Sequence, residues 1–467
     1  MKPRLSLSLV SLLVCGACGD NSDSTPDAPL MMPDSGIPDA AADAMPDGGP
    51  PGPMARVTVR FRGAPKQGAF VAFHDAAGTP IGFATTAADG SAEGEIVVGG
   101  IITVGVSETV GPQTNHHLVS IYAVDEDDDL LVEILRPQGS GTIPVIARWT
   151  LFGGAVSYQA AFCPNQYFVD PFPNPPELNL SDQVYNVPSD CLDSNNEATL
   201  MFVAKDGASG SGDILAFGGV KGVAANEVYN PPVVLEAKDT RVVQWANLPS
   251  QIGGNLISPS VLSFWYTNGI GVGNGYSAAP DSIGGSNPTG SMDVPGGSFA
   301  NFYDFAINGY IAALSFTPRT IEVGVRMQGT FPGPLTADMS EALPGIDTVT
   351  IDYSALPALQ SAWTTVSPLT GADGGRLQIG SQTLNDVGWS WEVTVPASAT
   401  SVVFPTLPEE MAAFEPPDDG RTFQVSDIFM LEHSDAAGYA DIRTDWFRYF
   451  SLDPRGTQTL RFSESSQ

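Results

Sequence analysis

Positive charge is scarce in this chain of 467 residues. It carries 20 Lys and Arg residues against 52 Asp and Glu residues, and its net charge at pH 7 is −32. Nucleic acids and anionic membrane surfaces are bound by clusters of Lys and Arg, because both present dense negative charge. The composition therefore excludes a nucleic-acid partner.

Metal-binding and catalytic motifs are also missing. The four histidines occur in no His-Glu-x-x-His sequence and in no Cys/His zinc spacing. His116 and His117 are adjacent, so on a strand they would face opposite sides and could not chelate one ion together. There is no Gly-x-Ser-x-Gly elbow and no phosphate-binding loop. We therefore predict no catalytic residue, no metal site and no cofactor, although the paired carboxylates of a glycosidase would leave no motif.

The apolar run near the N-terminus is too short to span a bilayer of about 30 Å. It follows Lys2 and Arg4 and ends in small residues before a cysteine, which is the pattern of a secretory signal peptide. The stretch Gly16-Ala17-Cys18 resembles the lipobox of bacterial lipoproteins. The resemblance implies that residues 1–17 are removed and that Cys18 is diacylated, which would anchor the protein to the outer membrane of the cell envelope. The alternative is plain secretion, with Cys15 and Cys18 both lost in the signal.

Residues 18–53 have the composition of an acidic linker. From residue 19 to residue 53 there are seven Asp residues, many Pro residues and no Lys or Arg. Low hydrophobicity, Pro and charge of one sign oppose ordered packing and keep a chain extended. This segment is similar to the Asp/Pro/Ala stalks of many Gram-negative lipoproteins. We expect a disordered spacer that reaches on the order of 100 Å.

The remaining residues have the composition of β-rich exported proteins. The chain contains 50 Gly and 39 Pro, and only 15% of its residues are charged. Such sequences form many turns and few long helices. The predicted fold class is all-β, with tandem β-sandwich modules over residues 54–139, 140–247 and 248–467.

The clearest module covers residues 54–139. Val57, Val59 and Phe61 alternate with polar residues, which is the pattern of a half-buried strand. Turn signals lie at residues 75–78 and 89–90, and further strand-like runs recur at intervals of about ten residues, as in a seven-stranded sandwich. These runs are 69–73, 81–86, 93–98, 101–106, 118–124 and 130–135. The segments 63–65, 68–73 and 86–92 resemble the carboxypeptidase regulatory-like (transthyretin-like, Ig-like) domain of exported bacterial proteins, which is not catalytic in that family.

The second module, residues 140–247, contains the only cysteines that would remain after export besides Cys18. Its expected strands are 143–151, 156–162, 198–204 and 214–218, around a Gly/Ser turn at residues 207–212. Cys163 and Cys191 form an even pair, which in an oxidising compartment predicts a disulfide. Closing a loop of about 29 residues would contribute roughly 3–4 kcal/mol in the chain-entropy model. A nucleophile or a metal ligand is the alternative, but neither cysteine has a histidine nearby in the sequence.

The third region, residues 248–467, contains a long Gly/Ser/Asn segment at residues 267–298. Long loops of this kind are either functional or disordered. Trp265, Tyr266 and Tyr303 flank the segment and could stack on sugar rings, or could pack into a sandwich core. Strands are expected at 321–327, 348–353, 377–379, 389–395, 401–404 and 459–462. In the fourth of these, Glu392 and Thr394 should form a solvated face.

One acidic cluster, residues 125–129, lies between two strand-like runs. Calcium needs six to eight oxygen ligands, and Asp125, Asp127 and Asp129 could supply some of them. The spacing is not that of a known calcium loop, and a solvated turn is the interpretation that we favour.

These features favour a lipid-anchored envelope protein of non-enzymatic type, whose β-sandwich modules display a binding surface for a protein or glycan partner. The first alternative is a secreted carbohydrate-active hydrolase whose carboxylates meet only in the fold. The second is a component of an outer-membrane β-barrel. The residues beyond the first module resemble those of uncharacterised exported β-rich lipoproteins.

Overall fold

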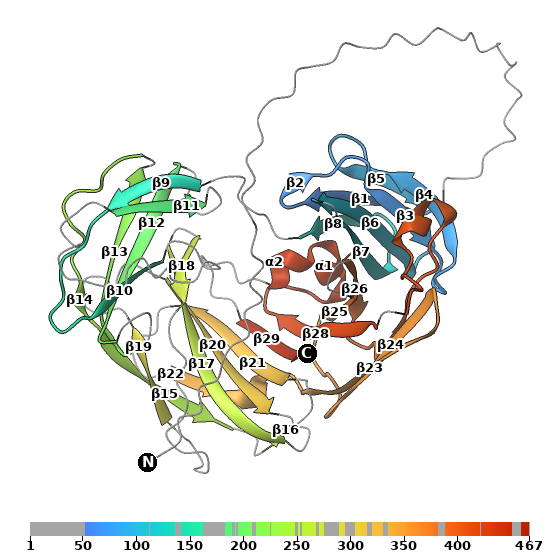
Figure 1. The fold of residues 1–467 in the computed structure, drawn as a ribbon. Helices are drawn as coiled ribbons and strands as arrows, with labels where there is room; N and C mark the ends of the chain where they lie inside the picture. The colour runs from blue at the N-terminus through green and yellow to red at the C-terminus, as the bar shows by residue number, and fades with distance from the viewer. Residues whose placement is uncertain are drawn as a thin grey trace, which may run out of the picture. The chain divides into compact units, whose positions relative to one another are not determined.

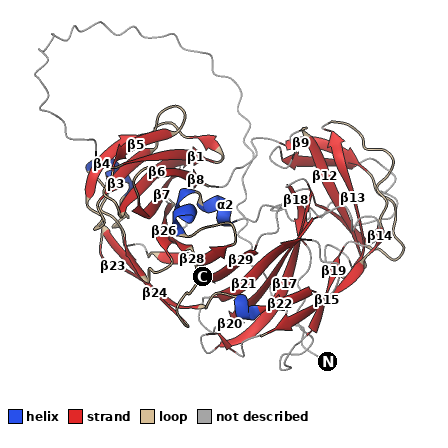
Figure 2. Ribbon diagram, turned by 180° about the vertical axis from the view of Figure 1, so that it is seen from behind, coloured by secondary structure: helices blue, strands red, loops and turns tan. Residues whose placement is uncertain are grey.

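Strands dominate the computed structural model, as Figures 1 and 2 show. The structure describes residues 52–111, 113–135, 142–161, 183–188, 192, 195–207, 212–224, 226–247, 251–252, 255–267, 270–274, 289–294, 304–314, 320–329, 335–381, 388–420, 422–450 and 459–466. Two short α-helices occur in these ranges, α1 (Tyr439–Thr444) and α2 (Trp446–Phe450). No helix there is both long and apolar enough to span a bilayer. The prediction of an all-β fold is confirmed.

The N-terminal module is a sandwich of two sheets. In one, β1 (Met54–Phe61) pairs with β2 (Ala64–Pro65), β5 (Ser91–Glu95) and β8 (Asp129–Ile134). In the other, the order is β4 (Pro80–Thr85), β3 (Phe70–His74), β6 (Gly100–Val110) and β7 (Gln113–Val124). Val57 and Val59 are fully buried against Val71 and Ile102 in the core between the sheets. Apart from the short β2, these are the seven strands that the sequence predicts.

Both turn signals of this module have the expected chemistry. Asp75 accepts hydrogen bonds from the backbone N–H groups of Ala77 and Thr79, and Gly78 has a φ of 83°. Asp89 accepts from the backbone N–H of Ser91, and Gly90 has a φ of 80°. Asp side chains that bond the backbone two residues on, together with glycine at positive φ, fix such turns.

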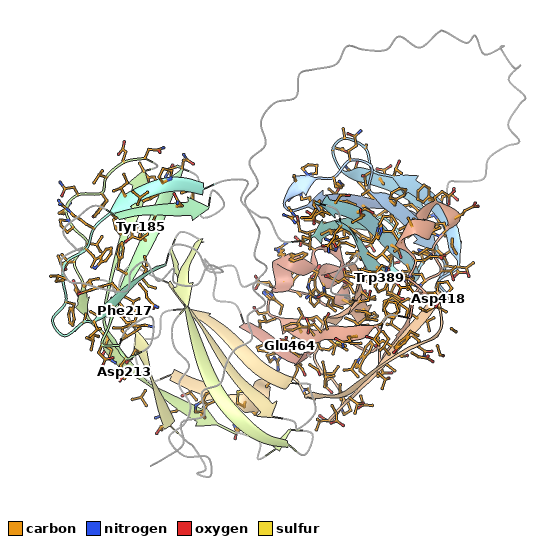
Figure 3. The ribbon with its side chains drawn as sticks, in the orientation of Figure 1. Tyr185, Asp213, Phe217, Trp389, Asp418 and Glu464 are labelled. Atoms are coloured by element: carbon orange, nitrogen blue, oxygen red, sulfur yellow. The ribbon has the colours of Figure 1, made fainter. Side chains whose placement is uncertain are left out.

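The second region also packs sheet on sheet. One sheet pairs β9 (Thr142–Ala147) with β11 (Gln183–Pro188), and the other has the order β10 (Ser157–Ala161), β12 (Glu197–Lys205), β13 (Ile214–Ala224) and β14 (Glu236–Ala237). The ring of Phe202 stacks on Trp149 at 5.1 Å and meets the edge of Tyr185 at 5.7 Å. Figure 3 shows Tyr185 and Phe217 on these sheets. The four strands expected here are confirmed.

Strands also occur inside the segment predicted as a long loop. A three-stranded sheet has the order β19 (Thr289–Val294), β15 (Asp239–Ala246) and β22 (Leu335–Asp338), and a 3₁₀ turn, η4 (Met339–Glu341), follows β22. The strand β18 (Ile270–Asn274) pairs with β17 (Asn255–Thr267), which also pairs with β16 (Gln251–Ile252) and β20 (Asp304–Leu314). The expectation of one uninterrupted loop over residues 267–298 is therefore wrong, because residues 270–274 and 289–294 form strands that pair with β17 and β15.

The C-terminal residues form another sandwich. A sheet of β23 (Ile346–Ala355), β24 (Ala358–Thr365) and β27 (Ser401–Val403) packs on β25 (Gly374–Ser381), β26 (Trp389–Pro396) and β28 (Gln424–His433). The 3₁₀ segment η5 (Glu409–Phe414) contributes Met411 and Phe414 to their common core. Figure 3 marks Trp389, which is buried there, and Asp418, which is exposed.

A single sheet joins the first module to the last one. β26 pairs in parallel with β7, from Trp389 opposite His116 to Thr394 opposite Ile121. β28 pairs with β29 (Thr459–Ser466), and β29 pairs with β21 (Thr320–Gly329), which continues to β20. Segments more than 250 residues apart in the chain thus share one ladder.

The solvated face expected on β26 is not solvated. Thr394 is 3% exposed, and the hydroxyl of Tyr439 in α1 donates a hydrogen bond of 3.0 Å to its carbonyl oxygen. Trp446 of α2 packs on the same side of the sheet, against Phe429. The expectation is wrong because the two helices, which the sequence analysis missed, cover this face.

Candidate functional site

Several of the predicted site residues lie outside the described residues. These are Cys18, Cys163, Cys191 and Tyr303. Trp265 and Tyr266 lie in β17, where their backbones pair with Phe305 and Asp304 of β20. The lipidation, the disulfide and the aromatic glycan site therefore stay predictions.

The acidic turn at residues 125–129 holds helix α1 in place. Arg443 of α1 is 9% exposed, and its Nε lies 2.8 Å from Oδ2 of Asp128 while its Nη2 lies 3.0 Å from Oδ1. Its Nη1 donates a hydrogen bond to the carbonyl oxygen of Ala123. Asp128 Oδ2 also accepts from the backbone N–H of Asp125, which closes the turn.

This arrangement does not gather Asp125, Asp127 and Asp129 around one point. Asp129 begins β8 opposite Arg56, and Asp127 adopts a left-handed conformation with its N–H bonded to Met54. Across the described ranges, no group of three or more His, Cys, Asp or Glu side chains is placed to hold a metal ion.

The four histidines lie in strands β3, β7 and β28. His116 and His117 face opposite sides of β7, as expected, because the ring of His116 meets Phe414 of one core and the ring of His117 lies near Phe61 at the other. Their Nδ1 atoms lie 2.9 Å from Ser107 Oγ and 3.0 Å from Ser390 Oγ respectively. Burial lowers the pKa of both, and also that of His433. His74 is 1% exposed, and burial lowers its pKa to about 4. These imidazoles therefore act as neutral packing groups at neutral pH.

Two partly buried carboxyl groups line a small cavity beneath the helices. Glu133 of β8 and Glu392 of β26 line it together with Arg443 and Trp446, and burial raises the pKa of both carboxyl groups. Glu392 lies 3.5 Å from the guanidinium of Arg376, and Glu133 accepts a hydrogen bond from the backbone of Gly63. The cavity measures about 10 Å³, which is about the space needed for one water molecule. It can hold a water but not a sugar ring.

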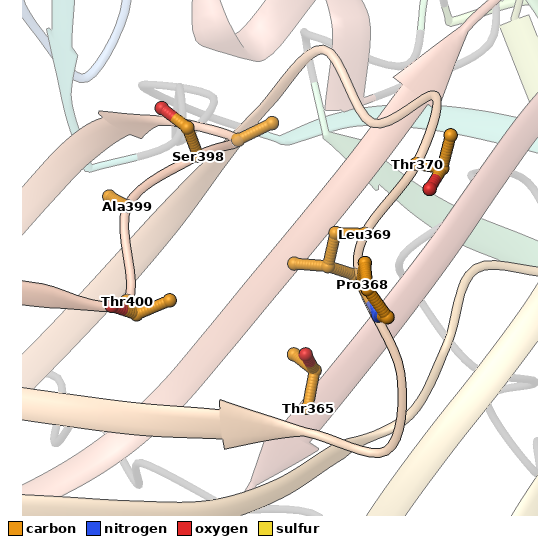
Figure 4. Close-up of a pocket in the computed structure, with 8 residues that line it drawn as sticks. Thr365, Pro368, Leu369, Thr370, Ser398, Ala399 and Thr400 are labelled. Carbon is orange, nitrogen blue, oxygen red and sulfur yellow. The ribbon is translucent and has the colours of Figure 1, made fainter.

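A larger pocket opens between two loops of the C-terminal sandwich (Figure 4). It has a volume of about 440 Å³, within the range of about 300–1,000 Å³ that is usual for small-molecule sites. One wall is the end of β24 and the loop after it, and the other is the turn between β26 and β27. The lining residues are Thr365, Pro368, Leu369, Thr370, Ala397, Ser398, Ala399 and Thr400. We call this the hydroxyl pocket, because four of the eight side chains are hydroxyls.

Backbone hydrogen bonds hold both walls. The backbone N–H of Thr370 donates to the carbonyl oxygen of Pro368 at 2.8 Å, and that of Ala399 donates to the carbonyl oxygen of Pro396 at 3.0 Å. A third hydrogen bond of 2.9 Å connects the two walls, from the backbone N–H of Trp363 in β24 to the carbonyl oxygen of Thr400. Trp363 is 3% exposed in the sandwich core, so the pocket rests on a packed support.

The chemistry of the hydroxyl pocket is that of binding. None of its eight residues is acidic, basic or nucleophilically activated, and within the part of the chain that the structure describes no hydrogen bond engages the four hydroxyls. Each hydroxyl can donate and accept hydrogen bonds, so all four are available to bond solvent or a ligand. Figure 4 shows Leu369 between the two walls, pointing toward the turn that carries Ala399 and Thr400.

Sequence reasoning missed this pocket because no motif marks it. The available signal was a pair of short segments in which a hydroxyl residue follows a proline by two positions, Pro368-Leu369-Thr370 and Pro396-Ala397-Ser398. Their proximity depends on the pairing of β24 with β27, which the sequence does not reveal.

Comparison with known proteins adds no relative. A scan against protein-family models finds no match to this chain, and a search of curated proteins finds no similar sequence.

Proposed function

We propose that this chain is a lipid-anchored protein of the outer membrane whose β-sandwich modules bind a protein or glycan partner. The observation that carries the binding role is the hydroxyl pocket, a cavity of about 440 Å³ without acid or base groups in its lining. The anchor and the acidic linker rest on the sequence of residues 1–53, in particular on Gly16-Ala17-Cys18.

The place of the pocket supports a binding role. Its residues lie in loops at the ends of strands, and loops on a rigid scaffold are where binding residues concentrate. The scaffold is continuous, because β26, which precedes the turn, pairs with β7 of the first module. A linker that enters at Met54 would attach to β1, whose sheet packs on the sheet that contains β7 and β26.

A carbohydrate-active hydrolase is the second candidate, and one observation favours it. Glu133 and Glu392 share a cavity and both have a raised pKa, as a general acid requires. The cavity admits about one water molecule, so a sugar could reach these groups only after the helices moved away. Binding at the hydroxyl pocket needs no such movement.

Two measurements test the proposal. Replacement Cys18→Ser should move the protein from the membrane fraction to the soluble fraction, and continued membrane association would contradict the lipid anchor. A photo-reactive amino acid at Ser398 should cross-link to an envelope component in intact cells, whereas the same group at the exposed Asp418, outside the pocket, should not. Equal labelling from both positions, or none from Ser398, would contradict a binding role for the pocket.

A further inference from the structure

The hydroxyl pocket also specifies the kind of ligand that it takes. Its polar groups are the side chains of Thr365, Thr370, Ser398 and Thr400, which come from both walls. A ligand that satisfies them must carry several groups that donate and accept at the same time. Hydroxyl groups on a compact ring meet this requirement.

The absence of charge in the lining narrows the ligand class. An anion such as a phosphate, a sulfate or a uronate would need a cation, and none lines the pocket of a chain with a net charge of −32. A cationic ligand would in turn be held by a carboxylate, and none lines the pocket. The ligand that fits is therefore uncharged.

The apolar part of the lining suits the carbon face of a sugar. Pro368 and Leu369 line the pocket from one wall, and Ala397 and Ala399 from the other, where their small side chains leave room. A pyranose presents C–H groups on its faces and hydroxyls at its rim, so it would place both types of group against matching surfaces. The backbone bonds of Trp363, Thr370 and Ala399 hold the walls before binding, which reduces the entropy lost on association.

We infer that the hydroxyl pocket binds a neutral saccharide, such as the uncharged end of an envelope or extracellular polysaccharide. This inference rests on the proposed binding function and deepens it by naming the ligand class. It uses a different part of the chain from Trp265, Tyr266 and Tyr303, the aromatic residues for which the sequence predicts sugar stacking.

The test is ligand binding to the full chain, purified in a detergent without a sugar headgroup. The probes are neutral trisaccharides of glucose, mannose and N-acetylglucosamine, and the comparison ligands are a trigalacturonate and a glucosamine trimer. Saturation-transfer NMR titration should show binding of at least one neutral trisaccharide and weaker or no binding of both charged ones. Tighter binding of a charged probe, or no binding of any neutral probe, would overturn the inference.

Variants locate the binding within the pocket. Thr370→Val keeps the side-chain shape and removes a hydroxyl, and combined with Ser398→Ala it should weaken binding about tenfold, which corresponds to the loss of two ordinary hydrogen bonds. Ser367→Ala is the matched control, because Ser367 is exposed in the same loop but does not line the pocket. Equal affinities of the double variant and the control would overturn the assignment to this pocket.

The proposed binding function and the saccharide inference can fail independently of each other. If no neutral saccharide binds but the photo-reactive group at Ser398 captures a defined protein in intact cells, the saccharide inference fails and the display function stands. If neither the saccharides nor cross-linking detects a ligand, both fail.

Discussion

Arg443, close to the C-terminus, makes a two-point ion pair with Asp128 of the first β-sandwich through its Nε and Nη2 atoms. The contacts measure 2.8 and 3.0 Å, and the two side chains are 9% and 10% exposed. Together with the β7–β26 ladder, this pair makes the two ends of the described chain into one packed unit.

Loss of this pair should destabilise the protein. Removing one partner of a buried ion pair leaves an uncompensated charge, so Asp128→Asn should lower the free energy of unfolding by on the order of 3 kcal/mol. The control is Asp127→Asn, an exposed position in the same turn, for which a change within about 0.5 kcal/mol is expected. Denaturant unfolding followed by tryptophan fluorescence measures both, and equal effects would show that the pair is not a structural link.

The hydrogen bond from Trp391 Nε1 to Ser120 Oγ provides a second test of the junction. It measures 2.8 Å, and Ser120 also bonds Thr103 in a fully buried environment. Ser120→Ala would leave the indole N–H unpaired and should lower the free energy of unfolding by about 1–3 kcal/mol. In a double-mutant cycle with Trp391→Phe, the two effects should fall short of additivity by at least about 0.5 kcal/mol. Strict additivity would mean that the two side chains do not interact.

The pKa of His74 predicts a loss of stability in acid. The folded state holds this pKa at about 4 against an ordinary value of 6.5. Between these two values the unfolded chain binds a proton that the folded one does not, so stability falls as the pH drops from about 6.5 to 4, by about 3 kcal/mol in total. Glu392, whose pKa is raised by burial, has the opposite effect on stability. The contribution of His74 is therefore obtained by comparing the wild type with a variant that lacks this histidine.

The measurement for His74 is the free energy of unfolding of the wild type and of His74→Gln at several pH values. The wild type should lose more stability than the variant over this interval. Parallel pH profiles would show that His74 does not titrate differently in the two states.

Two glycines with nearly the same φ allow the cost of backbone strain to be measured separately from the cost of steric crowding. Gly90 has a φ of 80° and Gly99 a φ of 81°, but a Cβ on Gly90 would lie 2.5 Å from the carbonyl oxygen of Val59, whereas a Cβ on Gly99 would meet nothing within 4 Å. Gly99→Ala should lower the free energy of unfolding by the conformational term alone, about 1–2 kcal/mol. Gly90→Ala should lower it clearly more, and equal shifts would contradict the close packing of this turn on β1.

Much of the first module could be predicted because its signals are local. Alternation in β1, the Asp75 and Asp89 side chains and the glycines that follow them act within a few residues of one another. Local patterns of this kind can be recognised in the sequence without knowing which strand is the partner.

The junction with the last module could not be predicted in this way, because strand partners are chosen over the whole chain. One signal was present: Leu118 and Val119 point to opposite faces of β7 and are both buried, as in a strand covered on both sides. The helices α1 and α2, of six and five residues, are too short to show a helical repeat. The hydroxyl pocket was missed for the same reason as the junction, since its two walls meet only through strand pairing.

The most direct test of the binding role is amide hydrogen exchange of the full chain with and without a neutral polysaccharide fraction from the envelope. The account predicts slower exchange in residues 366–373 and 397–400 together, with residues 125–129 unchanged as an internal reference. Unchanged exchange in the two walls of the hydroxyl pocket, or protection confined to other segments, would contradict it.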